Sequence, residues 1–266
     1  MWLTHSSSDS LDRSQQAAKN TEVLAGLKNG LLLAASVAVL LLPPLGTTGL
    51  LPERAKVQGS QVAGAGQRPQ QADFGTATPS PDAREIADWV ARSGDNLQAS
   101  FAIIDKRGAR LYVFTPDARL VGSSLVLLGS APGDDTAPDL GNRPLSQVRS
   151  HERTTAAGRF VSEPGHDETG ESVVWVDYDS ALAMHRVKVV DPKERRMERI
   201  ATDSVDDKRI SNGCINVPIP FFDAVVKPTL GASRAVVYVL PDVKPLKQVF
   251  ADAYDVSTRR GLSATL

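Results

Sequence analysis

The chain contains a single cysteine, Cys214, among its 266 residues, so no disulfide can form within it. Aromatic residues make up only 5%, and the 30 Lys and Arg residues are balanced by 31 Asp and Glu residues. Proteins that bind nucleic acids usually carry a basic stripe and aromatic rings for base stacking, so we expect no nucleic-acid partner. The four histidines occur without cysteine pairs or an H-E-x-x-H motif, so we expect neither a metal nor another cofactor.

The overall composition is that of a globular protein, with 41% hydrophobic and 23% charged residues. This excludes a wholly disordered chain, a collagen-like repeat and a protein with many membrane spans. The length corresponds to one large domain or two small ones.

The N-terminal third divides by composition into three segments. Residues 1–29 are polar, residues 30–51 carry no charge, and residues 52–82 are rich in Pro, Gln, Gly, Ala and Thr. The uncharged run has 13 residues before Pro43-Pro44 and 22 in all, where about 20 apolar residues span a bilayer. We interpret it as a signal anchor in the cytoplasmic membrane rather than a signal-peptide core, because no A-x-A cleavage site follows it closely. A buried helix is the remaining alternative.

Residues 52–82 read as a flexible linker, because such a composition buries too little apolar area to offset the entropy lost on ordering. The segment Ser80-Pro81-Asp82 then marks the start of a helix, which we place at 83–98 as a packing helix. We assign 99–245 to the main domain and 246–266 to a C-terminal extension.

Short apolar runs separated by turn residues dominate the main domain and predict a mostly β sandwich or barrel with few short helices. A turn at Asp191–Glu194 is expected to return the chain as a hairpin through 196–200. The odd spacing of Trp175 and Tyr178 places them on opposite faces of one strand, with Trp175 in the core. The expected strands lie at 101–105, 110–114, 120–121, 124–128, 172–178, 185–190 and 235–240, with a loop at 129–150.

The segment around Cys214 is the most informative part of the sequence. Gly213 permits an unusual backbone conformation and Asn216 can hydrogen-bond the turn, so the thiol can act as a nucleophile beside backbone amides. Attack requires the thiolate, and therefore a nearby base or positive charge. His185, Arg209 and Lys208 are the candidates, while a buried, inert thiol is the alternative.

Three segments, in this order, resemble the L,D-transpeptidase (YkuD) family. Residues 101–106 with 111–114 look like its opening hairpin, Thr155-Ala-Ala-Gly-Arg-Phe160 like its Thr-Pro-x-Gly-x-Phe signature, and Ser211-Asn-Gly-Cys-Ile-Asn216 like its Ser/Thr-His-Gly-Cys motif. The resemblance covers residues 99–241 and implies a mostly β, β-sandwich or barrel, catalytic domain. It further implies a cysteine acyl-transferase that acts on peptidoglycan stem peptides in cell-wall biogenesis and cell shape, and that carbapenems inhibit.

The resemblance also assigns roles to single residues. Cys214 matches the nucleophile and His185 the general base, while the backbone around Gly213 and Cys214 matches the oxyanion site. The motif-shaping positions are Gly213, Ser211, Asn212 and Asn216, and the tentative substrate-binding residues are Arg209 and Arg186.

Two departures from the family pattern stand out. Asn212 replaces a second histidine, and Arg186 follows the base where Gly or Ser is usual. The interval of 29 positions from His185 to Cys214 is also longer than is typical of the family. Two functions therefore stay open: an L,D-transpeptidase or L,D-carboxypeptidase, and a catalytically weak or inactive peptidoglycan-binding module on the same fold.

The implied partners are peptidoglycan stem peptides, carbapenem inhibitors and, as one of several acyl acceptors, an envelope lipoprotein. Because the wall lies outside the cytoplasmic membrane, we expect the catalytic domain in the periplasm, held to that membrane by residues 30–51.

Overall fold

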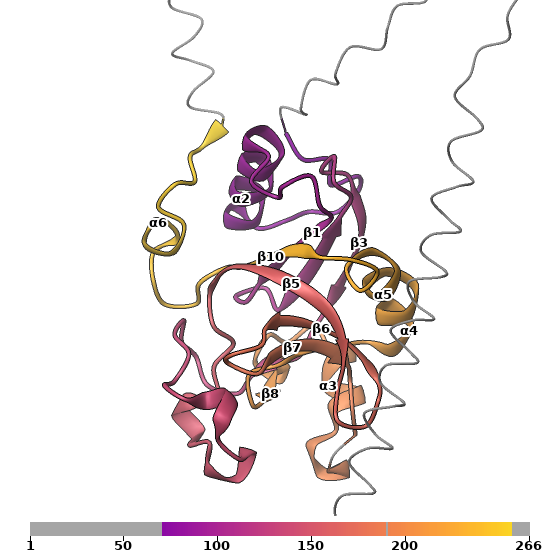
Figure 1. The fold of residues 1–266 in the computed structure, drawn as a ribbon, viewed down its shortest axis with the longest axis vertical. Coiled ribbons are helices and arrows are strands. Elements are labelled where there is room, and N and C mark those ends of the chain that lie inside the picture. The colour runs from indigo at the N-terminus through magenta and orange to yellow at the C-terminus, as the bar shows by residue number, and fades with distance from the viewer. Residues whose placement is uncertain (1–70, 190, 257–266) are drawn as a thin grey trace, which may run out of the picture. The chain divides into compact units, whose positions relative to one another are not determined.

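The computed structural model describes residues 71–189 and 191–256. In this part of the chain an eight-stranded sheet has the strand order β3-β2-β1-β10-β5-β6-β7-β9 (Figure 1). Its members are β1 (Phe101–Asp105), β2 (Arg110–Phe114), β3 (Leu120–Leu125), β5 (Gly158–His166), β6 (Ser172–Asp177), β7 (Leu182–Arg186), β9 (Ile215–Val217) and β10 (Ala235–Val239). The predicted class, mostly β with few short helices, is confirmed for the described residues.

The two edges of the sheet approach each other and nearly close it into a barrel. Leu127, just after β3, and Asn216 of β9 form an antiparallel bridge in which each amide donates to the other's carbonyl, at 2.9 and 2.8 Å. Beside this bridge, β4 (Leu128–Gly129) pairs in parallel with β8 (Arg209–Ser211). The closure satisfies edge groups that an open sheet would leave unpaired, and it brings the Cys214 segment next to residues 127–129.

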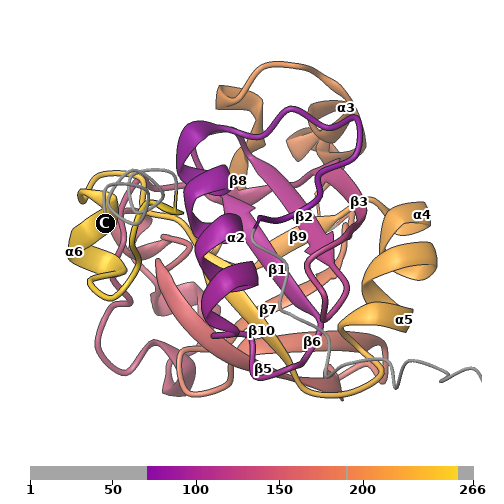
Figure 2. The same ribbon diagram turned by 90° about the horizontal axis from the view of Figure 1, so that it is seen from above.

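The interior of the barrel is filled by alternate residues of the strands. In β10, Val237 and Val239 face this core, whereas Val236 and Tyr238 face a second cluster under α2 (Pro81–Ser93). β10 is therefore buried on both faces, which is why it reads as a continuous apolar run. In Figure 2, α2 lies over β1 and β2, with α6 (Leu246–Val249) on one side and α4 (Ile219–Phe221) and α5 (Lys227–Thr229) on the other.

The predicted helix near residue 80 is present and is capped as its sequence indicates. The Ser80 hydroxyl accepts a hydrogen bond from the Ala83 amide at 3.2 Å, Pro81 is the first helical residue, and Gly94 ends the helix in a left-handed conformation with φ 71°. The helix thus spans 81–93 rather than 83–98.

Residues 71–80, which fall in the expected linker, pack against the domain. Phe74 is almost fully buried and meets Tyr112 and Phe114 edge-on, with ring centroids 5.5 and 5.1 Å apart. Ala72 is also buried, and its amide donates to Asp88. These buried side chains, together with backbone hydrogen bonds to residues 118 and 120, attach a segment whose average composition predicts disorder. The rest of the linker, the polar N-terminus and the uncharged segment 30–51 lie outside the described residues.

Three strand predictions need correction. The hairpin expected at 191–200 is helical, with η4 (Pro192–Glu194) followed by α3 (Arg196–Ala201). Arg195 turns the chain between them at φ 50°, and the buried Lys208 side chain donates to the carbonyls of Arg199 in α3 and of Thr202 just after it. His185 lies near the end of β7, not at the start of a strand.

Trp175 is half-buried rather than in the core, and its ring contacts Tyr178 at 5.1 Å. A register shift between Trp175 and Asp177 breaks the alternation on which the prediction relied. The expected loop at 129–150 contains short 3-10 turns, η1 (Leu140–Asn142), η2 (Leu145–Gln147) and η3 (Ser150–Glu152); the others among the described residues are η4 and η5 (Asp206–Lys208). No helix in the described ranges is long and apolar enough to cross a bilayer.

A fully buried lysine, Lys106, joins residues 133–134 to Thr155, which contacts the Cys214 turn. The Lys106 ammonium donates to Asp134 at 2.8 Å, to Gly133 at 2.6 Å and to the carbonyl of Thr155 at 2.7 Å. Asp134 accepts three further hydrogen bonds, from the amides of residues 242–244. Burial alone would raise the pKa of Asp134, but Lys106 and these amides hold it well below its usual range.

We predict that Lys106→Met lowers the free energy of unfolding by about 3–5 kcal/mol, because it leaves the Asp134 carboxylate buried without its cation. Urea denaturation measures this loss. The matched control is Arg107→Met, whose side chain is 53% exposed, with a change below about 0.5 kcal/mol. A loss for Lys106→Met of less than about 1 kcal/mol, the contribution of one neutral hydrogen bond, would contradict the assigned role.

Candidate active site

Cys214 occupies the tight turn between β8 and β9. Gly213 has φ 134°, a conformation that favours glycine. A Cβ atom there would lie 2.9 Å from the carbonyl oxygen of Thr154, so any other residue would displace the backbone at Thr154. The Thr155 hydroxyl donates to the Gly213 carbonyl at 2.7 Å and accepts from the Gly129 amide at 2.9 Å. Lys106, which donates to the Thr155 carbonyl, therefore stabilises the Cys214 turn through Thr155.

Side chains of the predicted motif close the turn from within. The Ser211 hydroxyl donates to the Cys214 carbonyl at 2.7 Å and accepts from the Gly213 amide at 3.1 Å. The Asn216 amide group donates to the same Cys214 carbonyl at 3.1 Å. The Gly213 amide donates to the Ser211 hydroxyl, so of the two backbone amides only that of Cys214 remains a candidate donor to an oxyanion.

Arg196, which sequence reasoning missed, supports this turn from α3. Its guanidinium donates to the Asn216 side-chain oxygen at 3.0 Å and to the Glu194 carboxylate at 2.6 Å, and its side chain is only 9% exposed. It lies in the segment that lengthens the interval between His185 and Cys214. The sequence predicts a hairpin here, and nothing local in it indicates the contact with Asn216, which lies 20 positions further along the chain.

The Cys214 thiol is half-buried and donates to the Ala181 carbonyl at 3.4 Å. Burial raises the pKa of the thiol, whereas the Ala183 backbone amide and the positive charge of Arg196 favour the thiolate. Because burial raises the pKa, the thiol is the resting form. The Ala183 amide and Arg196 are the groups that would stabilise the ionised sulfur.

His185 lies on β7, directly beside β9, and its register partner is Asn216, two residues after Cys214. Its Nδ1 lies 2.7 Å from the Arg186 carbonyl, which can only accept, so Nδ1 carries the proton and Nε2 is the basic nitrogen. Burial lowers the pKa of the imidazole, which favours the neutral form. Among the hydrogen bonds of the described residues, none joins this ring to the Cys214 sulfur.

A cavity of about 440 Å³ opens beside the sulfur. Asn212, Gly213 and Cys214 form part of its wall, and the β6–β7 turn forms another part, whereas His185 does not line it. The other lining residues are Thr136, Leu140, Gly141, Arg143, Pro144, Val148, Thr154, Ala156, Glu168, Ser180, Ala181 and Leu182.

Arg143 is the one cationic side chain that lines this cavity. It forms a two-point ion pair with Glu152, at 3.2 and 3.3 Å, and its Nε is buried with no hydrogen-bond partner in the described part of the chain. The two arginines singled out in the sequence lie elsewhere. Arg209 donates to Asp242 and to the Lys106 carbonyl, and Arg186 pairs with Asp223 and covers the Phe222 ring at 4.6 Å.

The described residues contain no group of three metal-ligating side chains. No protein-family model matches the chain, and no curated protein matches it in sequence. Among solved structures, it is similar to a variant of the helical cell shape determining protein Pgp2 from Campylobacter jejuni, with a TM-score of 0.36 and 12% sequence identity. The match covers 68% of this chain and 64% of that one, so this chain spans less than two thirds of that protein's length. A likeness at this level supports no statement about activity.

We predict that Arg196→Met slows alkylation of Cys214 by iodoacetamide at neutral pH, because loss of the nearby positive charge raises the pKa of the thiol. We expect the rate at neutral pH to fall by roughly three- to tenfold. The pH profile of alkylation measures the shift, and Cys214 is the only cysteine that can react.

The neighbouring Arg195→Met is the control, because that side chain is 70% exposed and pairs with Glu198. Arg196→Lys keeps the charge and should restore most of the profile. Equal profiles for Arg196→Met and Arg195→Met would refute the electrostatic role, and a lysine variant as slow as the methionine variant would reduce Arg196 to a purely structural residue.

Proposed function

We propose that this chain is a cysteine acyl-transferase of the cell envelope that cleaves the meso-diaminopimelyl–D-Ala bond of peptidoglycan stem peptides. The observation that carries the proposal is the placement of Cys214, on a glycine-dependent turn at the wall of a cavity, beside a strand that bears His185. The order of the three sequence segments that resemble the L,D-transpeptidase family supports the substrate class.

In the proposed reaction the Cys214 proton passes to Nε2 of His185, and the sulfur attacks the carbonyl carbon of the diaminopimelyl residue. The tetrahedral oxyanion accepts a hydrogen bond from the Cys214 amide, a contribution of roughly 3 kcal/mol per donor. The C–N bond then breaks, and the imidazolium gives its proton to the departing D-Ala amine. An amine of a second stem, a lipoprotein lysine or water takes the acyl group from sulfur.

The cavity offers charges that suit such a substrate. Arg143 lines the cavity and can meet a carboxylate through its guanidinium, and Glu168 lines the same cavity and can meet an amine. A stem peptide carries both groups near the scissile bond. Arg143 thereby takes the place of Arg209 and Arg186 in the proposed substrate contacts.

A second candidate is a catalytically weak or inactive peptidoglycan-binding module. One observation favours this candidate. The Cys214 thiol is hydrogen-bonded to the Ala181 carbonyl and the His185 ring to the Arg186 carbonyl, and the thiol and the ring are not hydrogen-bonded to each other. Catalysis therefore requires the thiol to leave the Ala181 carbonyl when substrate enters. In many enzymes the hydrogen bond between a nucleophile and its base shortens only when the substrate is bound.

We predict that the purified protein releases D-Ala from tetrapeptide muropeptides, and that Cys214→Ala and His185→Ala each abolish this release while leaving the fold intact. Mass spectrometry of the products measures turnover, and circular dichroism checks the fold. The matched control is His166→Ala, an exposed histidine at the end of β5, which should retain full activity.

Turnover that persists in Cys214→Ala would sink the assignment of the nucleophile. A wild-type protein that binds isolated cell-wall sacculi but releases no D-Ala would establish the binding module instead.

A further inference from the structure

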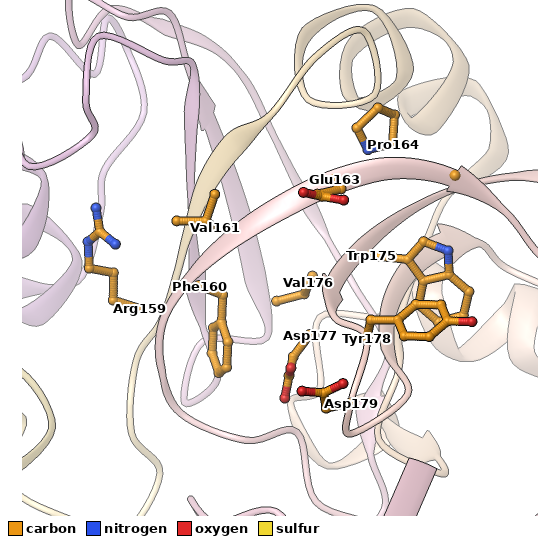
Figure 3. Close-up of a pocket in the computed structure, with 11 residues that line it drawn as sticks. Arg159, Phe160, Val161, Glu163, Pro164, Trp175, Val176, Asp177, Tyr178 and Asp179 are labelled. Carbon is orange, nitrogen blue, oxygen red and sulfur yellow. The ribbon is translucent and has the colours of Figure 1, made fainter. Parts of the chain in front are cut away.

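A second cavity, of about 570 Å³, lies on the outer side of β5, β6 and the β6–β7 turn (Figure 3). It is separated from the Cys214 cavity by that turn, because Asp179 lines the outer cavity while Ser180 and Ala181 line the inner one. Nothing in the proposed acyl transfer uses the outer cavity.

Two aromatic rings form one wall of the outer cavity. Tyr178 is 74% exposed, and its ring meets that of Trp175 at a centroid distance of 5.1 Å and an interplanar angle of 69°. Trp175 in turn lies against Gly165, where a Cβ atom would come within 2.5 Å of the indole. The glycine therefore lets the indole lie close to β5, and the indole supports a tyrosine ring in solvent.

Carboxylates dominate the polar groups of the lining. Figure 3 shows Asp177 and Asp179 between Phe160 on one side and Tyr178 on the other, with Glu163 across from them. Within the described part of the chain, the Asp179 carboxylate has no hydrogen bond or ion pair, whereas Asp177 accepts from Ser180 and Glu163 pairs with the exposed Arg234. Exposed ion pairs of the latter kind are weak and easily exchanged.

The one cation of the lining is already neutralised. Arg159 donates to the Asp95 carboxylate at 2.6 Å and to its carbonyl at 2.7 Å. The cavity therefore presents an uncompensated negative charge next to an exposed aromatic face, within the range of volumes that small-molecule or side-chain ligands occupy.

We propose that this outer cavity binds a ligand that carries an alkylammonium or guanidinium group, such as the side chain of a basic peptide. The cation lies against the Tyr178 ring, where the ring quadrupole attracts it, and pairs with Asp179 and Asp177. The site is independent of the acyl transfer proposed for Cys214, although a chain bound there lies just across the β6–β7 turn from it.

The test is calorimetric titration of the full-length protein, in a nonionic detergent, with a tetralysine peptide and with the same peptide acetylated on every side-chain nitrogen. We expect only the charged peptide to bind. Asp179→Asn and Tyr178→Ala should each weaken binding by about two- to fivefold, and the binding should fall as salt rises. The control is Asp252→Asn, an exposed carboxylate outside the cavity, which should bind like the wild type.

Equal binding of the acetylated peptide, or unchanged affinity in both cavity variants, would overturn the proposal. So would binding of a neutral N-acetylglucosamine tetrasaccharide that Tyr178→Ala abolishes, in a protein that does not bind tetralysine, because the cavity would then be a glycan site.

Discussion

The position of the thiol depends on the carbonyl group of Cys214 itself. This one oxygen accepts hydrogen bonds from the Ser211 hydroxyl and the Asn216 side chain, which tie the turn to β8 and β9 at once. The closure of the barrel depends on the same place, because Asn216 also bridges to Leu127. A turn held in this way presents its side chain in a fixed direction, which is what a nucleophile requires. The geometry that closes the sheet and the geometry that orients the sulfur are therefore one set of contacts.

Two buried cations support the turn from opposite sides. Lys106 fixes Thr155, whose hydroxyl holds the Gly213 carbonyl, and Arg196 holds Asn216 from α3. Buried charges cost desolvation energy, and each of these is matched by a carboxylate, Asp134 or Glu194. Arg196 also places positive charge near the thiol, and neither cation lines the cavity beside the sulfur.

Local patterns were enough to predict β1, β2, β6 and β10, the capped helix at Ser80 and the turn at Cys214, because each depends on residues adjacent in sequence. They did not predict β5, β8 or β9. The prediction failed where distant parts of the chain decide. Phe74 packs on rings of β2, Lys208 caps α3, and a register shift turns Trp175 toward Tyr178. The roles of Arg143 and Arg196 were equally out of reach, since Arg143 is distinguished only by its place on the cavity wall, and Arg196 contacts Asn216 from a helix where a hairpin was expected. The motif residues Ser211, Gly213, Asn216 and Cys214 do come together at the turn.

Intact-mass analysis after incubation with a carbapenem tests the acylation of Cys214 most directly. If His185 removes the proton from Cys214, as proposed, the sulfur opens the strained β-lactam amide and retains the whole drug, so the protein should gain one drug mass, and Cys214→Ala should gain none. Iodoacetamide provides the internal reference for accessibility of the same sulfur. A folded protein whose Cys214 is alkylated but which never gains the carbapenem mass would have a reachable but unactivated thiol, and the acyl-transferase account would be wrong.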